Sequence, residues 1–278
     1  MPPPRATLVG VPWDASSSFQ RGAASAPPLI RQALWSASSN TWNERGDDVS
    51  SSEVLEDAGD LVLAADPAAA REAIESRIRE LVAAGRAPLV LGGDHSITYP
   101  VLRGWRGAGP PTVLHFDAHS DLYDAFEGDR YSHACPFARV MEEGLACRLV
   151  QVGIRCMTAH LRSQVQRFGV DVYGAGRWRD VLPVVAGLRG PVYVSLDLDV
   201  LEPMLAPGLS HPEPGGLLVR DVLDVLGALV APVIGADIVE YNPANDVRDL
   251  TARVAAKFVK ELVGTMRGGG RWKVEGRR

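Results

Sequence analysis

Short runs of apolar residues, rich in Val and Leu, recur along the chain and are separated by more polar segments. Near-continuous apolar runs of this kind are typical of strands that are buried on both faces. The runs are Thr7–Val11, Pro88–Leu91, Thr112–Phe116, Leu149–Ile154, Val192–Leu198 and Val233–Val239. They predict six buried strands.

Several of the intervening segments carry apolar residues at the spacing of a helix. Within residues 67–84, for example, Ile74, Ile78 and Leu81 return to one face of a helix. The predicted helices cover residues 67–84, 161–168, 217–230 and 249–266. Strands that alternate with helices predict an α/β fold with helices on both sides of a mostly parallel sheet.

The chain contains no internal repeat and no long linker. We therefore predict a single domain over residues 1–278, with its core between residues 6 and 266. The Ser-rich segment 35–52 is predicted to form a long surface loop. Residues 268–278, which begin with Gly-Gly-Gly, are predicted to form a frayed tail.

Composition and charge narrow the range of partners. A chain of 278 residues with 46% hydrophobic content can bury a substantial core. Its net charge of −5, without a basic block, argues against nucleic acid or an anionic membrane surface as a partner. No apolar run approaches the roughly 20 residues that span a bilayer, and the N-terminal residues lack the order of a signal peptide. We expect a soluble, cytoplasmic protein that binds a small neutral or cationic molecule.

The three cysteines are odd in number and lack the C-x-x-C spacing of a zinc or redox site. They are Cys135, Cys147 and Cys156. Free cysteines behave mostly as small buried hydrophobic residues, so we expect ordinary thiols.

Four polar clusters stand at the ends of predicted strands. They are Gly92-Gly93-Asp94-His95-Ser96, Asp117-Ala118-His119-Ser120-Asp121, Asp197-Leu198-Asp199 and Glu240-Tyr241-Asn242-Pro243. Open α/β sheets place their ligand sites at the carboxyl ends of the strands. We therefore expect the four clusters to meet at one edge of the sheet.

The spacing within the second and third clusters predicts that several ligands point the same way. In an extended chain, residues two apart project to the same face, so Asp117 and His119 point together. Asp197 and Asp199 do the same at the end of their strand. Asp121, on the turn after His119, can fold back toward them.

So many carboxylates at one edge predict a metal site. Without a cation, their repulsion and desolvation would cost several kcal/mol. Four carboxylates with the imidazoles of His95 and His119 form a mixed oxygen and nitrogen ligand set, which favours Mn²⁺ and leaves Zn²⁺, Co²⁺, Ni²⁺ or Fe²⁺ possible. Six ligands suit two ions, roughly 3.5 Å apart, better than one ion. The six residues are His95, Asp117, His119, Asp121, Asp197 and Asp199.

These clusters resemble the signatures of the ureohydrolase family, which comprises the arginases, the agmatinases and their relatives. The matching stretches are residues 92–96, 117–121, 195–199 and 212–216, and the likeness extends from Leu8 to about Leu262. Residues 127–133, 206–211 and 235–243 resemble most closely the plant-type arginases, which lie near the bacterial agmatinases. The resemblance implies a three-layer α/β/α fold with a mostly parallel eight-stranded sheet. It also implies two Mn²⁺ ions per subunit and assembly into homotrimers or homohexamers.

The resemblance further implies a role for each site residue. One ion would be bound by His95, Asp117, Asp121 and Asp197, and the other by Asp117, His119, Asp197 and Asp199. His133 stands where family members carry a proton-shuttling histidine, and imidazole titrates near neutral pH. Glu240 stands where they carry the carboxylate that pairs with the guanidinium group of the substrate, and a carboxylate can accept two parallel N–H bonds from that planar cation.

The predicted reaction is hydrolysis of a guanidino group to urea and an amine, by a water that the two ions activate. The motifs do not discriminate between agmatine and L-arginine as the substrate. Guanidino acids such as guanidinobutyrate are the next candidates. Arg130 or Arg155 could meet a substrate carboxylate, whereas Glu127 and Asp129 could favour the second cation of agmatine. Two other classes of function remain open for this chain. One is a non-catalytic regulator built on this fold, and the other is a single-metal deacetylase-like or phosphoester hydrolase with related ligands.

Overall fold

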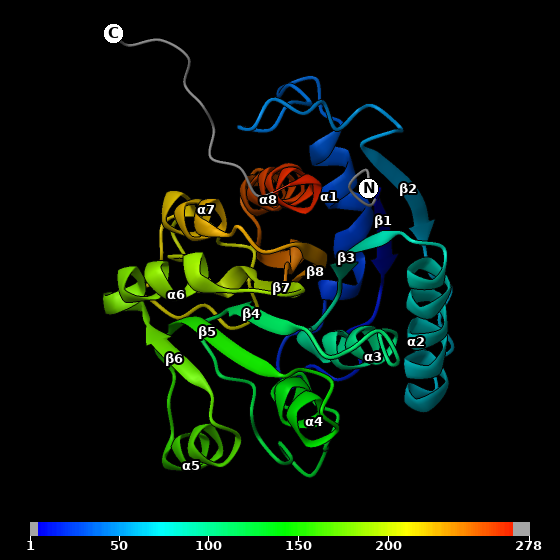
Figure 1. Ribbon diagram of the computed structural model, residues 1–278. Helices are drawn as coiled ribbons and strands as arrows, with labels where there is room; N and C mark the ends of the chain where they lie inside the picture. Colours follow the sequence, from blue (N-terminus) through cyan, green and yellow to red (C-terminus); the bar gives the residue numbers. More distant parts are fainter. Residues whose placement is uncertain (1–4, 269–278) are drawn as a thin grey trace, which may run out of the picture.

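The computed structural model describes residues 5–268. Its centre is a single eight-stranded sheet (Figure 1). Its strands are β1 Ala6–Val11, β2 Leu55–Asp60, β3 Ala87–Gly92, β4 Thr112–Phe116, β5 Arg148–Ile154, β6 Asp171–Gly174, β7 Val192–Asp197 and β8 Val233–Val239. All neighbouring strands are parallel, in the order β2-β1-β3-β8-β7-β4-β5-β6. The predicted parallel α/β sheet is confirmed.

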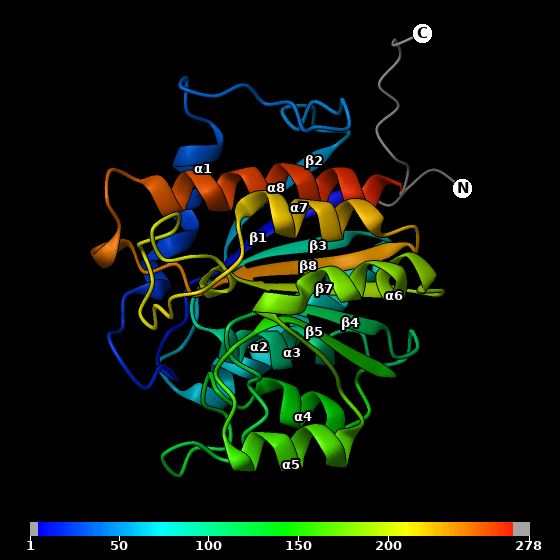
Figure 2. The ribbon, with the colours of Figure 1, turned by 90° about the vertical axis from the view of Figure 1, so that its left-hand side faces the viewer.

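Helices cover both faces of this sheet, which Figure 2 shows from its edge. They are α1 Ala26–Leu34, α2 Pro67–Ala83, α3 Thr98–Arg103, α4 Pro136–Glu142, α5 Ala159–Phe168, α6 Leu182–Gly187, α7 Val219–Ala228 and α8 Leu250–Arg267. One core joins the sheet to α1, α6, α7 and α8, and a second core joins it to α2, α3, α4 and α5. The architecture is therefore the expected three-layer α/β/α arrangement.

All six predicted strands are present, each with its ends within one residue of the prediction. The two strands that the apolar pattern missed, β2 and β6, form the two edges of the sheet. In β2 only Leu55 is buried and the other five residues are half-buried or exposed. An edge strand needs no continuous apolar run, because it has a neighbour on one side only.

Helix α1 also escaped the apolar pattern, since its sequence begins Ala-Pro-Pro. Both prolines lie in the first turn of the helix, where their missing N–H groups would have no intrahelical partner. The segment Trp35–Ser52, predicted as a surface loop, has no helix or strand, although Asn43 and Val49 are buried in it. It is held against α8 by a hydrogen bond from Asn43 Nδ2 to the carbonyl oxygen of Lys260 (3.3 Å).

The strand order decides where the polar clusters meet. β3, β8, β7 and β4 are consecutive in the centre of the sheet, and the four clusters lie at their carboxyl ends. Among the described residues, no helix is long and apolar enough to cross a membrane. The predicted frayed tail lies outside the described residues except for Gly268.

Candidate metal centre and active site

The six predicted metal ligands converge at the carboxyl ends of β3, β4 and β7. The ring of His95 is at the centre: its Nδ1 lies 3.0 Å from Asp121 Oδ2, 3.1 Å from Asp117 Oδ2 and 3.2 Å from Asp197 Oδ2. All four side chains are buried. His95 Nδ1 nevertheless makes no hydrogen bond of acceptable geometry. An unpartnered buried nitrogen facing three carboxylates fits a cation between them.

A second group of ligands adjoins the first. His119 Nδ1 lies 2.8 Å from Asp199 Oδ2 and 3.4 Å from Asp117 Oδ1, so the two oxygens of Asp117 face both groups. Asp117, His119 and Asp199 each offer a ligand atom within 4.8 Å of the others. The structure thus brings all six predicted ligands together in two groups that share Asp117.

Local turns explain why the D-x-H and D-x-D spacings deliver these side chains. Asp197 caps the short helical turn Leu198–Val200 by accepting a hydrogen bond from the backbone N–H of Asp199 (2.8 Å). Asp117 accepts one from the N–H of His119 (2.5 Å) in the same way. Asp121 adopts a positive φ of 51°, which folds its side chain back toward His95. Short polar side chains favour such local bonds at the ends of strands and helices.

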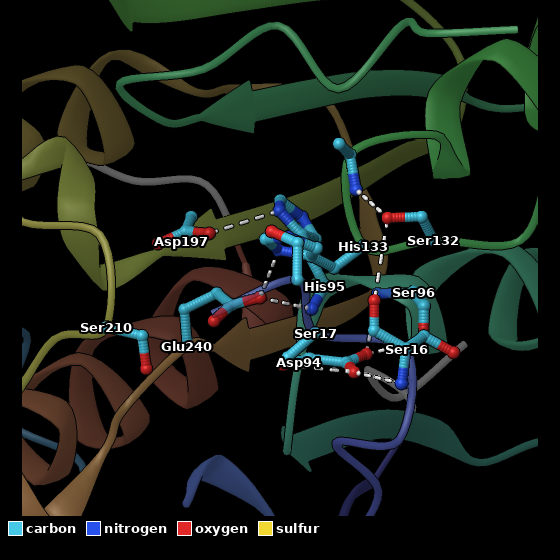
Figure 3. A network of polar contacts seen from close by, with 12 residues as sticks. Ser16, Ser17, Asp94, His95, Ser96, Ser132, His133, Asp197, Ser210 and Glu240 are labelled. Carbon is cyan, nitrogen blue, oxygen red and sulfur yellow. Dashed lines mark hydrogen bonds and ion pairs between the residues drawn. The ribbon is translucent and has the colours of Figure 1, made fainter. Parts of the chain in front are cut away.

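His133 and Glu240 form a pair beside this group, shown in Figure 3. His133 Nδ1 lies 3.2 Å from Glu240 Oε1, and the same oxygen accepts a hydrogen bond from the backbone N–H of His95 (2.8 Å). Glu240 begins where β8 ends and has a φ of 64°, so a sharp turn directs its carboxylate toward His95. The two predicted catalytic residues are therefore in contact with each other and next to the metal group.

A cavity of about 310 Å³ opens over these residues. The polar residues that line it include His119, Asp121, Asp197, Asp199, His133 and Glu240. It is also lined by Ser18, Tyr123, Phe126, Met157, Thr158 and Leu161. No Lys or Arg is among the described residues that line it.

Comparison with known proteins decides the family. The family model described as "Arginase family" matches residues 4–264, nearly the whole chain. The chain belongs to the arginase family. It is 46% identical to the mitochondrial arginase 1 of Arabidopsis thaliana over 272 residues, which cover 92% of this chain and 79% of the relative. It is also 35% identical to the mitochondrial guanidino acid hydrolase of Homo sapiens, covering 93% of this chain and 77% of that protein.

Solved structures agree with this membership. The arginase from Medicago truncatula has a TM-score of 0.90 and 43% identity, covering 95% of this chain and 88% of that one. The proclavaminate amidino hydrolase from Streptomyces clavuligerus has a TM-score of 0.85 and 32% identity, covering 96% and 93%. As a member of the arginase family, the chain is a metal-dependent ureohydrolase, an enzyme that hydrolyses guanidino compounds.

Electrostatics in this arginase-family site also favour a cation. Burial, with the charges of Asp199 and Asp117, raises the pKa of Asp197 well above its ordinary value. Burial and Asp117 likewise raise the pKa of Asp199 to about 6. Asp117 has a lowered pKa despite its burial, because His115, His119 and His95 surround it. Carboxylates that disfavour one another's charge in a buried site are stabilised together by a divalent ion.

Three further polar residues, for which no role was predicted, adjoin the site. Asp94 is buried and accepts hydrogen bonds from the N–H of Ser16 (3.0 Å) and the hydroxyl of Ser17 (3.3 Å), which holds this loop at the cavity (Figure 3). His115 Nε2 contacts Asp117 Oδ2 at 2.8 Å. His211 lines the cavity beside His133. His115 lies inside an apolar strand and His211 lies in a loop, so neither residue belongs to a polar cluster at a strand end that would have indicated a role.

Proposed function

We propose that the chain is a dinuclear manganese amidinohydrolase that splits a guanidino group into urea and an amine. The observation that carries the proposal is the pair of ligand groups joined by Asp117 beneath one cavity. One ion would be held by His95, Asp117, Asp121 and Asp197, and the other by Asp117, His119, Asp197 and Asp199. Mn²⁺ suits a set of four carboxylates and two imidazoles.

The two ions, when bound, would lower the pKa of a water and so supply hydroxide for addition to the guanidino carbon. The side chains supply orientation and a proton. Glu240 Oε2 is buried and has no hydrogen-bond partner among the described residues, so it is free to accept N–H bonds from the guanidinium group. A carboxylate paired with that planar cation fixes its central carbon over the ligand groups.

His133 holds the proton that the departing amine needs. Burial lowers its pKa, but the hydrogen bond and charge of Glu240 outweigh burial and raise the pKa to about 9. The ring is therefore protonated at neutral pH and can act as an acid. As the carbon–nitrogen bond breaks, the electron pair stays on the amine nitrogen and the proton of His133 moves to it.

L-arginine is the first substrate that we propose, because the plant arginases named above share 43–46% identity with the chain. Agmatine is the second, since a cavity without a lining Lys or Arg among the described residues offers no cation to a substrate carboxylate. Guanidinobutyrate, a guanidino acid, is the third substrate that we propose. Urea release from the three compounds by Mn²⁺-loaded protein, measured in parallel, ranks them by kcat/KM. Absence of urea from all three would overturn the proposed reaction.

Replacing Glu240 with Gln tests the proposed anchor. It keeps the shape of the side chain and removes its charge, so kcat/KM should fall at least about 100-fold through poorer positioning of the carbon. Glu53→Gln, at an exposed residue that does not line the cavity, is the matched control and should stay near the parent value. Equal kinetics for the two variants would remove Glu240 from the site.

The predicted homotrimer or homohexamer and the cytoplasmic location stay predictions. We propose a single domain as well, since one sheet takes its strands from residues 6–239.

A further inference from the structure

A second set of possible metal ligands lies in the same cavity, apart from the six residues described above. His133, His211 and Glu240 each offer one ligand atom, and these atoms lie within 4.8 Å of one another. Two imidazoles and one carboxylate, with water as the fourth ligand, form a common catalytic zinc site in proteins. We propose that this trio is a third divalent-cation site, which takes Zn²⁺ in preference to Mn²⁺ and inhibits the enzyme when occupied.

The distances within the trio suit a small cation. Ligands at about 2.0–2.1 Å from a tetrahedral zinc ion are separated from one another by about 3.3 Å. His133 Nδ1 and Glu240 Oε1 are already 3.2 Å apart. The ring of His211 is next to that of His133, with centroids 4.9 Å apart and planes inclined by 32°. The ligand atom that His211 offers lies within 4.8 Å of those of His133 and Glu240.

An independent observation points to a missing partner at this place. Glu240 Oε2 is buried, and it has no hydrogen-bond partner among the described residues. The other oxygen, Oε1, is engaged by His133 and by the N–H of His95 (Figure 3). An unsatisfied buried carboxylate oxygen is costly, and a cation that contacts both oxygens of Glu240 would relieve that cost in place of the substrate's guanidinium group.

The loop that carries His211 is fixed in place. The hydroxyl of Ser210 donates to the carbonyl oxygen of Gln20 (2.8 Å) and accepts a hydrogen bond from Asn242 Nδ2 (2.9 Å). Burial lowers the pKa of His211, so its imidazole is neutral at pH 7, which is the form that binds metal. The open cavity of about 310 Å³ leaves room for the water ligand.

Ligand chemistry sets the preference between ions. Zn²⁺ binds a given site of nitrogen and oxygen ligands more tightly than Mn²⁺ does, and imidazole suits zinc well. The six-residue group is richer in carboxylates, with four against two imidazoles, so it suits Mn²⁺ better than the trio does. Zinc in the trio occupies Glu240 and displaces the proton of His133. The inhibition therefore rests on the proposed function, whereas the binding of the ion does not.

The test is a titration of the Mn²⁺-loaded chain with Zn²⁺ in excess Mn²⁺. Metal content is measured by mass spectrometry after equilibrium dialysis, and urea release is measured in the same samples. The variants are His211→Asn and, in case that chain folds poorly, His211→Gln. His160→Asn is the matched control, because His160 is a half-exposed histidine on α5 that does not line the cavity.

We expect one additional zinc ion per chain in the parent and in His160→Asn, with inhibition that a higher substrate concentration relieves. Both His211 variants should bind this ion at least about tenfold more weakly, with the same shift in the inhibition constant relative to their own zinc-free activity. Unchanged binding of the extra ion in a folded His211 variant would overturn the site. Binding without inhibition would overturn the inhibitory role. A His211-dependent ion in a chain that releases no urea would uphold the site while the proposed reaction fails.

Discussion

Ser18 Oγ lies 2.9 Å from His133 Nε2, so a hydroxyl bonds the ring nitrogen that Glu240 does not contact. Ser18 is exposed, whereas His133 is mostly buried. Backbone contacts keep the two together, because the N–H of His133 donates to the carbonyl oxygen of Ser16 (3.1 Å). The serine hydroxyl therefore connects the proposed proton carrier with solvent.

We predict that Ser18→Ala lowers kcat more than it raises KM. The lost hydrogen bond is worth about 0.5–1.5 kcal/mol, which corresponds to a fall of about two- to tenfold in kcat. Ser18→Thr keeps the hydroxyl and should retain most of the activity. Steady-state kinetics of both variants would contradict a role for the hydroxyl if Ala performed as well as Thr.

Asp199→Ala should remove one metal ion. Asp199 is proposed as a ligand of one ion only, whereas Asp117 and Asp197 are shared between the two, so its loss leaves the other ligand group complete. Metal analysis of the Mn²⁺-loaded variant should give about one ion per chain, against about two in the parent and in Asp224→Ala, an exposed position on α7. A single ion in the parent that survives in Asp199→Ala would contradict the dinuclear site.

Glu44 should make stability depend on pH in the acid range. Its hydrogen bonds to Arg220, at 2.7 and 2.8 Å, and its contact with Lys257 lower its pKa from 4.5 to about 2. A lowered folded-state pKa stabilises the fold above the unfolded value, and this contribution is lost as pH falls from about 4.5 to about 2. Because the pair is partly exposed, we expect about 1 kcal/mol at neutral pH.

Urea denaturation of Glu44→Gln should therefore show lower stability than the parent at pH 7 and a difference that shrinks toward pH 2. Glu53→Gln serves as the control, since Glu53 is exposed and makes no ion pair within the described residues. A difference for Glu44→Gln that stays constant with pH would show that its charge does not act through this pair.

Gly93→Ala should destabilise the chain at the metal centre. A Cβ at Gly93 would lie 1.7 Å from the carbonyl oxygen of Trp13, so two backbone segments would have to separate. Overpacking in a rigid core costs about 1–3 kcal/mol, and the shift would also disturb Glu240, whose N–H donates to the Gly93 carbonyl oxygen (2.9 Å). Gly187→Ala in α6 meets no atom within 4 Å and should be neutral or stabilising in the same denaturation experiment. Equal stability of the two variants would contradict this close approach.

The central strands and the candidate metal ligands were predictable from the sequence alone. Buried parallel strands must be apolar on both faces, so runs such as Thr112–Phe116 are visible without a structure. The candidate ligands can be predicted from their spacing, because residues two apart after a strand share a face, as Asp117 and His119 do. Both signals are local, and local geometry is what a linear pattern records.

The edge strands and the distant partners in the site became visible in the three-dimensional structure and not in the sequence. β2 is largely exposed and is defined by its pairing with β1, not by its own residues. Ser18 is 115 positions from His133, and His211 reaches the same ring from another loop. Such contacts arise from the order of strands in the sheet and from the loops that this order brings together, and hydrophobic periodicity carries no information about either.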